Sequence, residues 1–132
     1  MPVELNHTIV AARDKHASAA FLAEVLDLEV GAEFGPFVPV ETANGVTLDF
    51  MDTDPARITS QHYAFLVSDA EFDAIMDRIR RAGLTYYADP GRHRPGQINH
   101  DHGGRGAYFD DPDGHNLEIL THPYVTQPYG NV

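Results

Sequence analysis

The chain has 132 residues, 42% of them hydrophobic, a formal net charge of -11 and no cysteine. The lack of cysteine excludes disulfides, thiolate metal ligands and a cysteine nucleophile, and the acidic balance disfavours nucleic acid and anionic membranes as partners. Polar residues interrupt every apolar run well before the roughly 18 residues that a membrane span needs. The first residues show no signal-peptide pattern, so we expect one compact domain in the cytoplasm.

The first half of the chain predicts a strand, a helix and three further strands. The strand covers residues 5–10, and Asp14 follows as the helix N-cap because its carboxylate can accept free first-turn N–H groups. A helical stripe is formed by Ala17, Phe21, Val25 and Leu28. The three strands are expected near residues 30–34, 37–41 and 46–51, with Asn44-Gly45 as the hairpin turn.

The second half predicts the same order of elements. A strand at residues 62–67 leads to Asp69 as helix N-cap, and Gly83 stands where a left-handed residue would end the helix. The apolar stripe of this helix consists of Phe72, Ile75, Met76 and Ile79. Strands are expected near residues 85–88, 106–109 and 116–121, the last one after the turn Asp111-Pro112-Asp113-Gly114.

The two halves form an internal repeat with an offset of 55 residues. His7 corresponds to His62, Asp14 to Asp69, and Phe21 to Met76. The expected fold is therefore a single α+β domain over residues 1–122, built from two βαβββ modules at about residues 3–53 and 60–121. Residues 123–132 are expected to form a C-terminal tail.

A long loop distinguishes the second module. His7 and Asp49 are 42 positions apart, whereas His62 and Glu118 are 56 apart, and most of the difference lies in residues 89–105. Loops of this length are often lids or binding loops. Its basic residues predict either a patch that attracts an anionic substrate or a solvated loop; they are Arg92, His93, Arg94, His100, His102 and Arg105.

Each module contributes one histidine from its first strand and one carboxylate from its last. Because strand side chains alternate between faces, the first module can present His7 and Asp49, and the second His62 and Glu118. Two histidines and one carboxylate leave coordination positions open, as in non-haem Fe²⁺ oxygenases, whereas a fourth ligand favours a more closed Lewis-acid site. A lone strand histidine is usually a hydrogen-bonded residue and a lone glutamate usually faces solvent, but the repetition favours a metal site of His7, His62 and Glu118. Asp49 is a ligand, a substrate contact or a surface residue.

Three segments resemble the vicinal oxygen chelate superfamily, which includes glyoxalases, bleomycin resistance proteins and extradiol dioxygenases. They are Asn6-His7-Thr8, Gln61-His62-Tyr63-Ala64-Phe65, and residues 104–118 with their Asp-Pro-Asp-Gly turn before Glu118. The resemblance implies a curved half-barrel of two βαβββ modules with one divalent metal on its concave face. It also implies a small-molecule substrate and a homodimer.

The favoured branch of this superfamily is the extradiol dioxygenases. Their signature runs from a histidine through an aliphatic–tyrosine pair to the metal-binding glutamate, and His100, Tyr108 and Glu118 follow it here. Ala107 departs from the pattern, since a larger aliphatic residue is expected there. The resemblance implies that His100 and Tyr108 lie beside a catecholic substrate and that Fe²⁺ is the favoured ion. Taken alone, Tyr108 would be a core aromatic residue and His100 a solvated loop residue.

Two other branches stay open. A glyoxalase-like isomerase or lyase would use Mn²⁺, Ni²⁺ or Zn²⁺, with Asp49 at the position of the proton-moving glutamate but one methylene shorter. His62-Tyr63-Ala64-Phe65 resembles fosfomycin thiol transferases, although no Lys or Arg follows Glu118. A bleomycin-type binding protein is the non-enzymatic alternative, and such binders generally lack the His and Glu ligand set.

Overall fold

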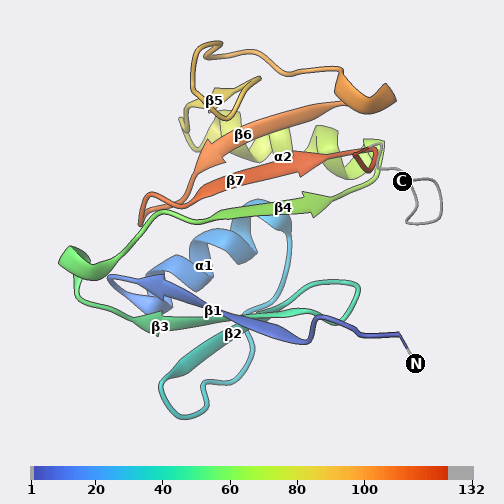
Figure 1. Cartoon of the computed structure of the whole chain (residues 1–132). Coiled ribbons are helices and arrows are strands. Elements are labelled where there is room, and N and C mark those ends of the chain that lie inside the picture. Colours follow the sequence, from blue (N-terminus) through green and yellow to red (C-terminus); the bar gives the residue numbers. More distant parts are fainter. Residues whose placement is uncertain (1, 125–132) are drawn as a thin grey trace. The chain divides into compact units, whose positions relative to one another are not determined.

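The computed structural model describes residues 2–124, which form two compact units (Figure 1). The first unit comprises Met1–Gln61 together with Asp111–His115, and the second comprises His62–Asp110 together with the chain from Asn116 onward. Most of the expected C-terminal tail lies outside the described residues. Within them, no helix combines the length and the apolar character that crossing a bilayer requires.

The first unit is a three-stranded sheet with one helix. Its elements are β1 (His7–Ala12), α1 (Lys15–Leu26), β2 (Phe37–Glu41), β3 (Thr47–Asp52) and the short 3₁₀ helix η1 (Pro55–Arg57). The strand order is β1-β3-β2, with β1 parallel and β2 antiparallel to β3.

The prediction of a strand near residues 30–34 is wrong. Only two isolated bridges form there, Val30 to Val40 and Phe34 to Phe37. One of the two β2 residues between these contacts is Pro39, which has no N–H to donate to a continuous ladder. The segment therefore touches β2 at separate points, including the Gly31 N–H bond to the Pro39 carbonyl.

Helix α1 begins as expected but buries a different stripe. The Asp14 carboxylate accepts the N–H groups of His16 and Ala17 at 3.0 and 3.2 Å. The buried residues are Ser18, Ala19, Leu22, Ala23 and Val25, so of the predicted stripe only Val25 is buried. This helix is apolar or small almost all round, and hence its sequence period did not identify which face packs on the sheet.

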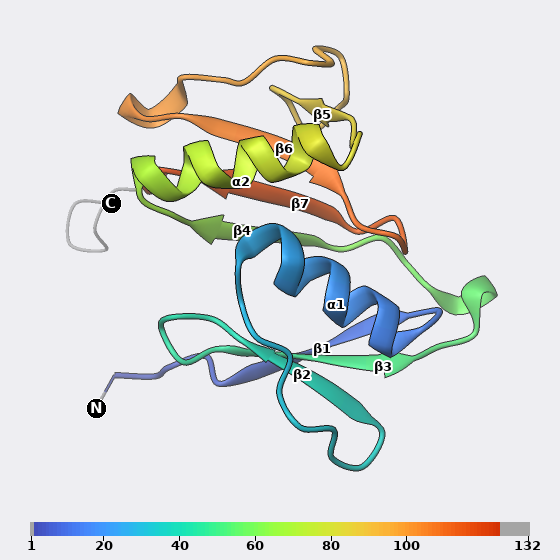
Figure 2. The same cartoon turned by 180° about the vertical axis from the view of Figure 1, so that it is seen from behind.

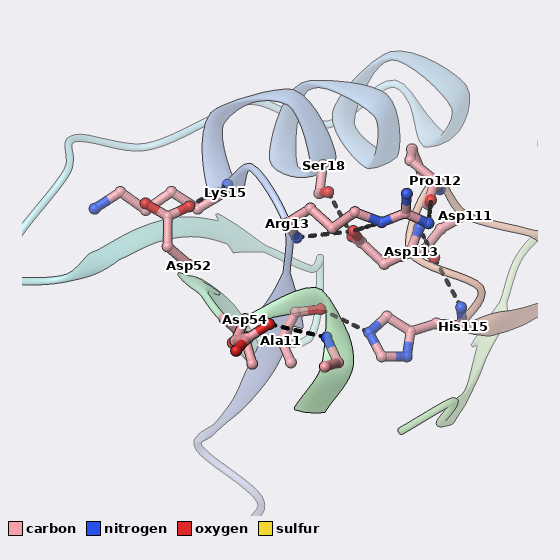
Figure 3. Close-up of polar contacts among 12 residues, drawn as sticks. Ala11, Arg13, Lys15, Ser18, Asp52, Asp54, Asp111, Pro112, Asp113 and His115 are labelled. Atoms are coloured by element: carbon pink, nitrogen blue, oxygen red, sulfur yellow. Dashed lines mark hydrogen bonds and ion pairs between the residues drawn. The ribbon is translucent and has the colours of Figure 1, made fainter. Parts of the chain in front are cut away.

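The turn at Asp111–His115 is fastened within the first unit (Figure 3). Asp113 accepts the Arg13 main-chain N–H at 2.9 Å and the Ser18 hydroxyl at 2.6 Å. The buried His115 ring accepts the Gln61 N–H at Nδ1 and donates from Nε2 to the Ala11 carbonyl at 2.8 Å. These contacts fix the residues that immediately precede the last strand.

The second unit contains the complete βαβββ order. Its elements are β4 (His62–Leu66), α2 (Asp69–Arg81), β5 (Tyr86–Tyr87), the short 3₁₀ helix η2 (Asp101–Gly103), β6 (Gly106–Asp110) and β7 (Asn116–Leu120). The strand order is β4-β7-β6-β5, with β4 parallel to β7 and the other pairs antiparallel. Figure 2 shows α2 lying along one face of this sheet.

Helix α2 packs as the sequence predicts, except at its start. The predicted stripe is buried, and full burial of four such side chains contributes about 6–12 kcal/mol; it consists of Phe72, Ile75, Met76 and Ile79. Gly83 has the expected positive φ of 70°. The prediction of Asp69 as N-cap is wrong, because Ser68 caps the helix and forms a reciprocal capping box with Glu71.

Candidate metal centre

The same His and carboxylate arrangement occurs in both sheets. In the first unit, His7 pairs with Thr47 and Asp49 lies two residues further along β3. In the second unit, His62 pairs with Asn116 and Glu118 lies two residues further along β7. Each histidine therefore shares a sheet face with its carboxylate, as strand alternation predicted.

His62 and Glu118 are brought together on the second sheet. Nε2 of His62 lies 3.0 Å from Oε1 of Glu118. Nδ1 of His62 lies 3.0 Å from both the main-chain oxygen and Oδ1 of Asn116. Both neighbours of Nδ1 are acceptors, so this nitrogen carries a hydrogen. The other ring nitrogen, Nε2, faces the carboxylate.

This pair requires a cation between its two atoms or a second proton on the ring. A neutral imidazole lone pair and a carboxylate oxygen repel each other at 3.0 Å, and Glu118 is only 2% exposed, so water does little to screen it. Two donor atoms that each lie about 2.1 Å from one ion, at neighbouring coordination positions, are themselves about 3 Å apart. Metal-bound histidines also typically donate their other N–H to a carbonyl, as His62 does to Asn116. The donors thus fit a divalent metal.

The second oxygen of Glu118 is bound by a tyrosine. The Tyr124 hydroxyl donates to Oε2 of Glu118 at 2.7 Å and lies 3.1 Å from the Tyr108 hydroxyl. Burial, the bond with Tyr108 and the bond to Glu118 together raise the pKa of Tyr124 far above its ordinary value. Burial also raises the pKa of Tyr108, and the Glu118 charge acts in the same direction. Both phenols therefore remain protonated at neutral pH.

Tyr108 lies next to Glu118, the proposed metal ligand, in the second sheet. It is the direct cross-strand neighbour of Glu118, is 7% exposed, and its ring centroid lies 6.0 Å from that of His62. His100, by contrast, is exposed and precedes η2. Another histidine of this loop, His102, contacts Tyr124, which in turn binds Glu118. The ring centroids of His102 and Tyr124 lie 4.2 Å apart.

His7 and Asp49 belong to the first unit. His7 is exposed, and its Nδ1 lies 2.7 Å from Oδ1 of Asn6. Asp49 is 4% exposed, and its Oδ1 is buried without a hydrogen-bond partner in the described structure. Over residues 2–124, no three His, Asp or Glu side chains cluster closely enough to hold a metal ion. The role of His7 as third ligand and that of Asp49 remain predictions.

Arginines of the long loop are engaged by carboxylates. Arg92 forms a two-point contact with Asp110 at 2.7 and 3.1 Å. Arg105 binds Asp69 at 2.9 Å and Asp73 at 2.7 Å, and its guanidinium lies over the Phe72 ring. These contacts neutralise two of the charges that the sequence assigned to a substrate-attracting patch.

Tyr124 is the residue that sequence reasoning missed. It lies six positions after Glu118 and beyond the end of β7 at Leu120. Strand alternation predicts which face a side chain occupies only while the strand continues, so no periodic signal pointed to it. A hydroxyl-bearing aromatic residue shortly after the proposed ligand was the available hint.

Comparisons with known proteins agree with this architecture. The family model described as Glyoxalase/Bleomycin resistance protein/Dioxygenase superfamily matches residues 4–119. The solved structure of Oxidase ChaP-H2 is 66% identical, with a TM-score of 0.93 over 96% of this chain and 98% of that one. Oxidase ChaP-H1 is 58% identical, with a TM-score of 0.90 over 95% of this chain and 100% of that one. Glutathione transferase FosA from Serratia marcescens is 28% identical over 87% of this chain and 78% of its own length. The chain belongs to the Glyoxalase/Bleomycin resistance protein/Dioxygenase superfamily.

Proposed function

We propose that this protein is a metal-dependent oxidase of extradiol-dioxygenase type that acts on a small phenolic or catecholic substrate. His7, His62 and Glu118 would hold one divalent ion, with Fe²⁺ favoured. The observation that carries the proposal is the His62–Glu118 pair, in which Asn116 fixes the ring so that Nε2 meets Oε1 at 3.0 Å. The 66% identity with a protein named as an oxidase supports the reaction class.

The face around Glu118 suits an aromatic substrate. Tyr87, Tyr108 and Glu118 lie in one row across β5, β6 and β7, and Leu66 on the same face of β4 is exposed. Stacking and apolar contact favour flat rings on such a surface. An anionic phosphonate would need free cationic groups, whereas Arg92 is paired and the chain beyond Glu118 contains no Lys or Arg.

A divalent metal held by His62 and Glu118 would supply an electrophilic centre for neighbouring substrate oxygens. The side chains around it orient these ligands and the substrate. Asn116 keeps the His62 ring in one orientation. Tyr108 places its hydroxyl beside Tyr124 and Glu118, where a lone pair of that oxygen can accept a hydrogen bond from a substrate hydroxyl. Asp49, whose buried Oδ1 has no hydrogen-bond partner in the described structure, is assigned the role of accepting a substrate proton.

The second candidate is a thiol transferase of the fosfomycin-resistance type. The observation in its favour is the 28% identity with Glutathione transferase FosA. The pairing of Arg92 with Asp110, and of Arg105 with Asp69 and Asp73, disfavours it.

Oxygen consumption separates the two. The protein would be reconstituted anaerobically with Fe²⁺ and mixed with a panel of catechols and fused-ring dihydroxyarenes in an oxygen electrode. The proposal predicts substrate-dependent O₂ uptake that is lost in His62→Ala. Absence of uptake across the panel, together with Mn²⁺-dependent consumption of fosfomycin and glutathione, would establish the transferase instead.

A further inference from the structure

Tyr124 connects the C-terminal segment to the candidate metal ligand. Its hydroxyl lies 2.7 Å from Oε2 of Glu118 and 3.1 Å from the Tyr108 hydroxyl. A carboxylate only accepts hydrogen bonds, so Tyr124 uses its single proton on Glu118 and accepts from Tyr108. The three groups form a directed chain from Tyr108 through Tyr124 to Glu118.

The two oxygens of Glu118 consequently have different partners. Oε2 faces the Tyr124 hydroxyl, whereas Oε1 faces Nε2 of His62 at 3.0 Å. A short hydrogen bond to an ionised carboxylate is about twice as strong as one between neutral groups. The hydrogen bond to Tyr124 therefore disfavours Oε2 as a second metal ligand when Oε1 binds the metal.

The Tyr124 ring also contacts a residue of the long loop. The His102 ring lies 4.2 Å from it with a 30° tilt. His102 adopts the left-handed backbone conformation with φ of 58°, and Gly103 follows with φ of 78°. The loop at residues 89–105 therefore holds the tyrosine against Glu118.

We propose that Tyr124 is a positioning residue that holds Glu118 by Oε2, so that Glu118 binds the metal through Oε1 alone. The proposal rests on the metal site proposed above. A one-oxygen carboxylate ligand leaves one more coordination position for substrate oxygens or O₂ than a two-oxygen ligand does. Outer hydrogen-bond partners of metal ligands commonly contribute 10–100-fold to metal affinity.

Tyr124→Phe removes the hydroxyl and keeps the ring. The test measures Co²⁺ binding to the full chain by calorimetry, together with the visible absorption of bound Co²⁺. We expect Tyr124→Phe to bind Co²⁺ at least about 10-fold more weakly than the wild type. We also expect a weaker visible band, because a two-oxygen Glu118 raises the coordination number. Tyr86→Phe is the matched control, since Tyr86 contacts Arg80 on the opposite face of β5, and it should change neither quantity.

The outcomes separate the two claims. If the wild type binds Co²⁺ and Tyr124→Phe binds it with the same affinity and spectrum, the positioning role is wrong and the metal site stands. Equal losses in Tyr124→Phe and Tyr86→Phe would indicate a general structural effect and also overturn the role. If the wild type binds no Co²⁺, both the metal site and the positioning role are wrong.

Discussion

Replacing Asp113 with alanine should destabilise the first unit strongly. The Asp113 side chain is 2% exposed and accepts the Arg13 N–H at 2.9 Å and the Ser18 hydroxyl at 2.6 Å. Hydrogen bonds to a charged group contribute about 1.5–3 kcal/mol each, and unpaired buried donors add to the cost. Allowing for non-additivity, we expect the free energy of unfolding to fall by about 3 kcal/mol. For a chain of this size, that corresponds to a fall in Tm of about 10 °C.

Urea unfolding of the purified variants measures this loss. Asp54→Ala is the matched control, because Asp54 is an exposed carboxylate that accepts one N–H, from Ala56 at 3.0 Å (Figure 3). Asp54→Ala should lower the free energy of unfolding by about 1 kcal/mol or less. In a Ser18→Ala background the Asp113→Ala change should cost less than in the wild type, because one of its bonds is already gone. An Asp113→Ala loss no larger than that of Asp54→Ala would refute the reasoning.

Two further predictions concern α2. Arg105→Ala should lower stability by about 1–2 kcal/mol while leaving KM unchanged, because the guanidinium binds Asp69 and Asp73 and not the substrate; a raised KM with unchanged stability would restore the substrate-patch hypothesis. Bonds from the Ser68 N–H and hydroxyl lower the pKa of Glu71. The ionised Glu71 side chain therefore stabilises the folded state above pH 4.5, and this stabilisation is lost as pH falls through the lowered pKa. Glu71→Gln should flatten this part of the curve of unfolding free energy against pH. An unchanged curve would contradict the assignment.

The sequence predicted the second unit better than the first because its signals were less ambiguous. Charged residues flank the apolar stripe of α2, so Phe72 and Ile79 could only face the sheet. In α1 the small residues around Ser18 left the buried face undetermined. The irregular segment before β2 follows from the missing N–H of Pro39, which a pattern of apolar residues does not reveal.

At the candidate site, strand alternation predicted which strand faces carry His62 and Glu118, whereas Tyr108 was named from the resemblance to the dioxygenase signature. Each lies on a regular strand, and the parallel pairing of β4 with β7 sets them on one face. Tyr124 was not predictable in this way, because it follows the end of β7 and reaches Glu118 through a change in chain direction. His100 and His102 also lie outside the regular strands, so strand alternation could not predict which of the two histidines lies near Glu118.

Metal content tests the central claim most directly. The protein would be purified without chelator and subjected to elemental analysis beside a His62→Ala variant. We predict about one equivalent of divalent metal per chain in the wild type, with iron favoured, and its loss in the variant, since His62 Nε2 and Glu118 Oε1 form the 3.0 Å donor pair. No bound metal in the wild type, even after anaerobic reconstitution with Fe²⁺, Mn²⁺, Ni²⁺ and Zn²⁺, would contradict the account.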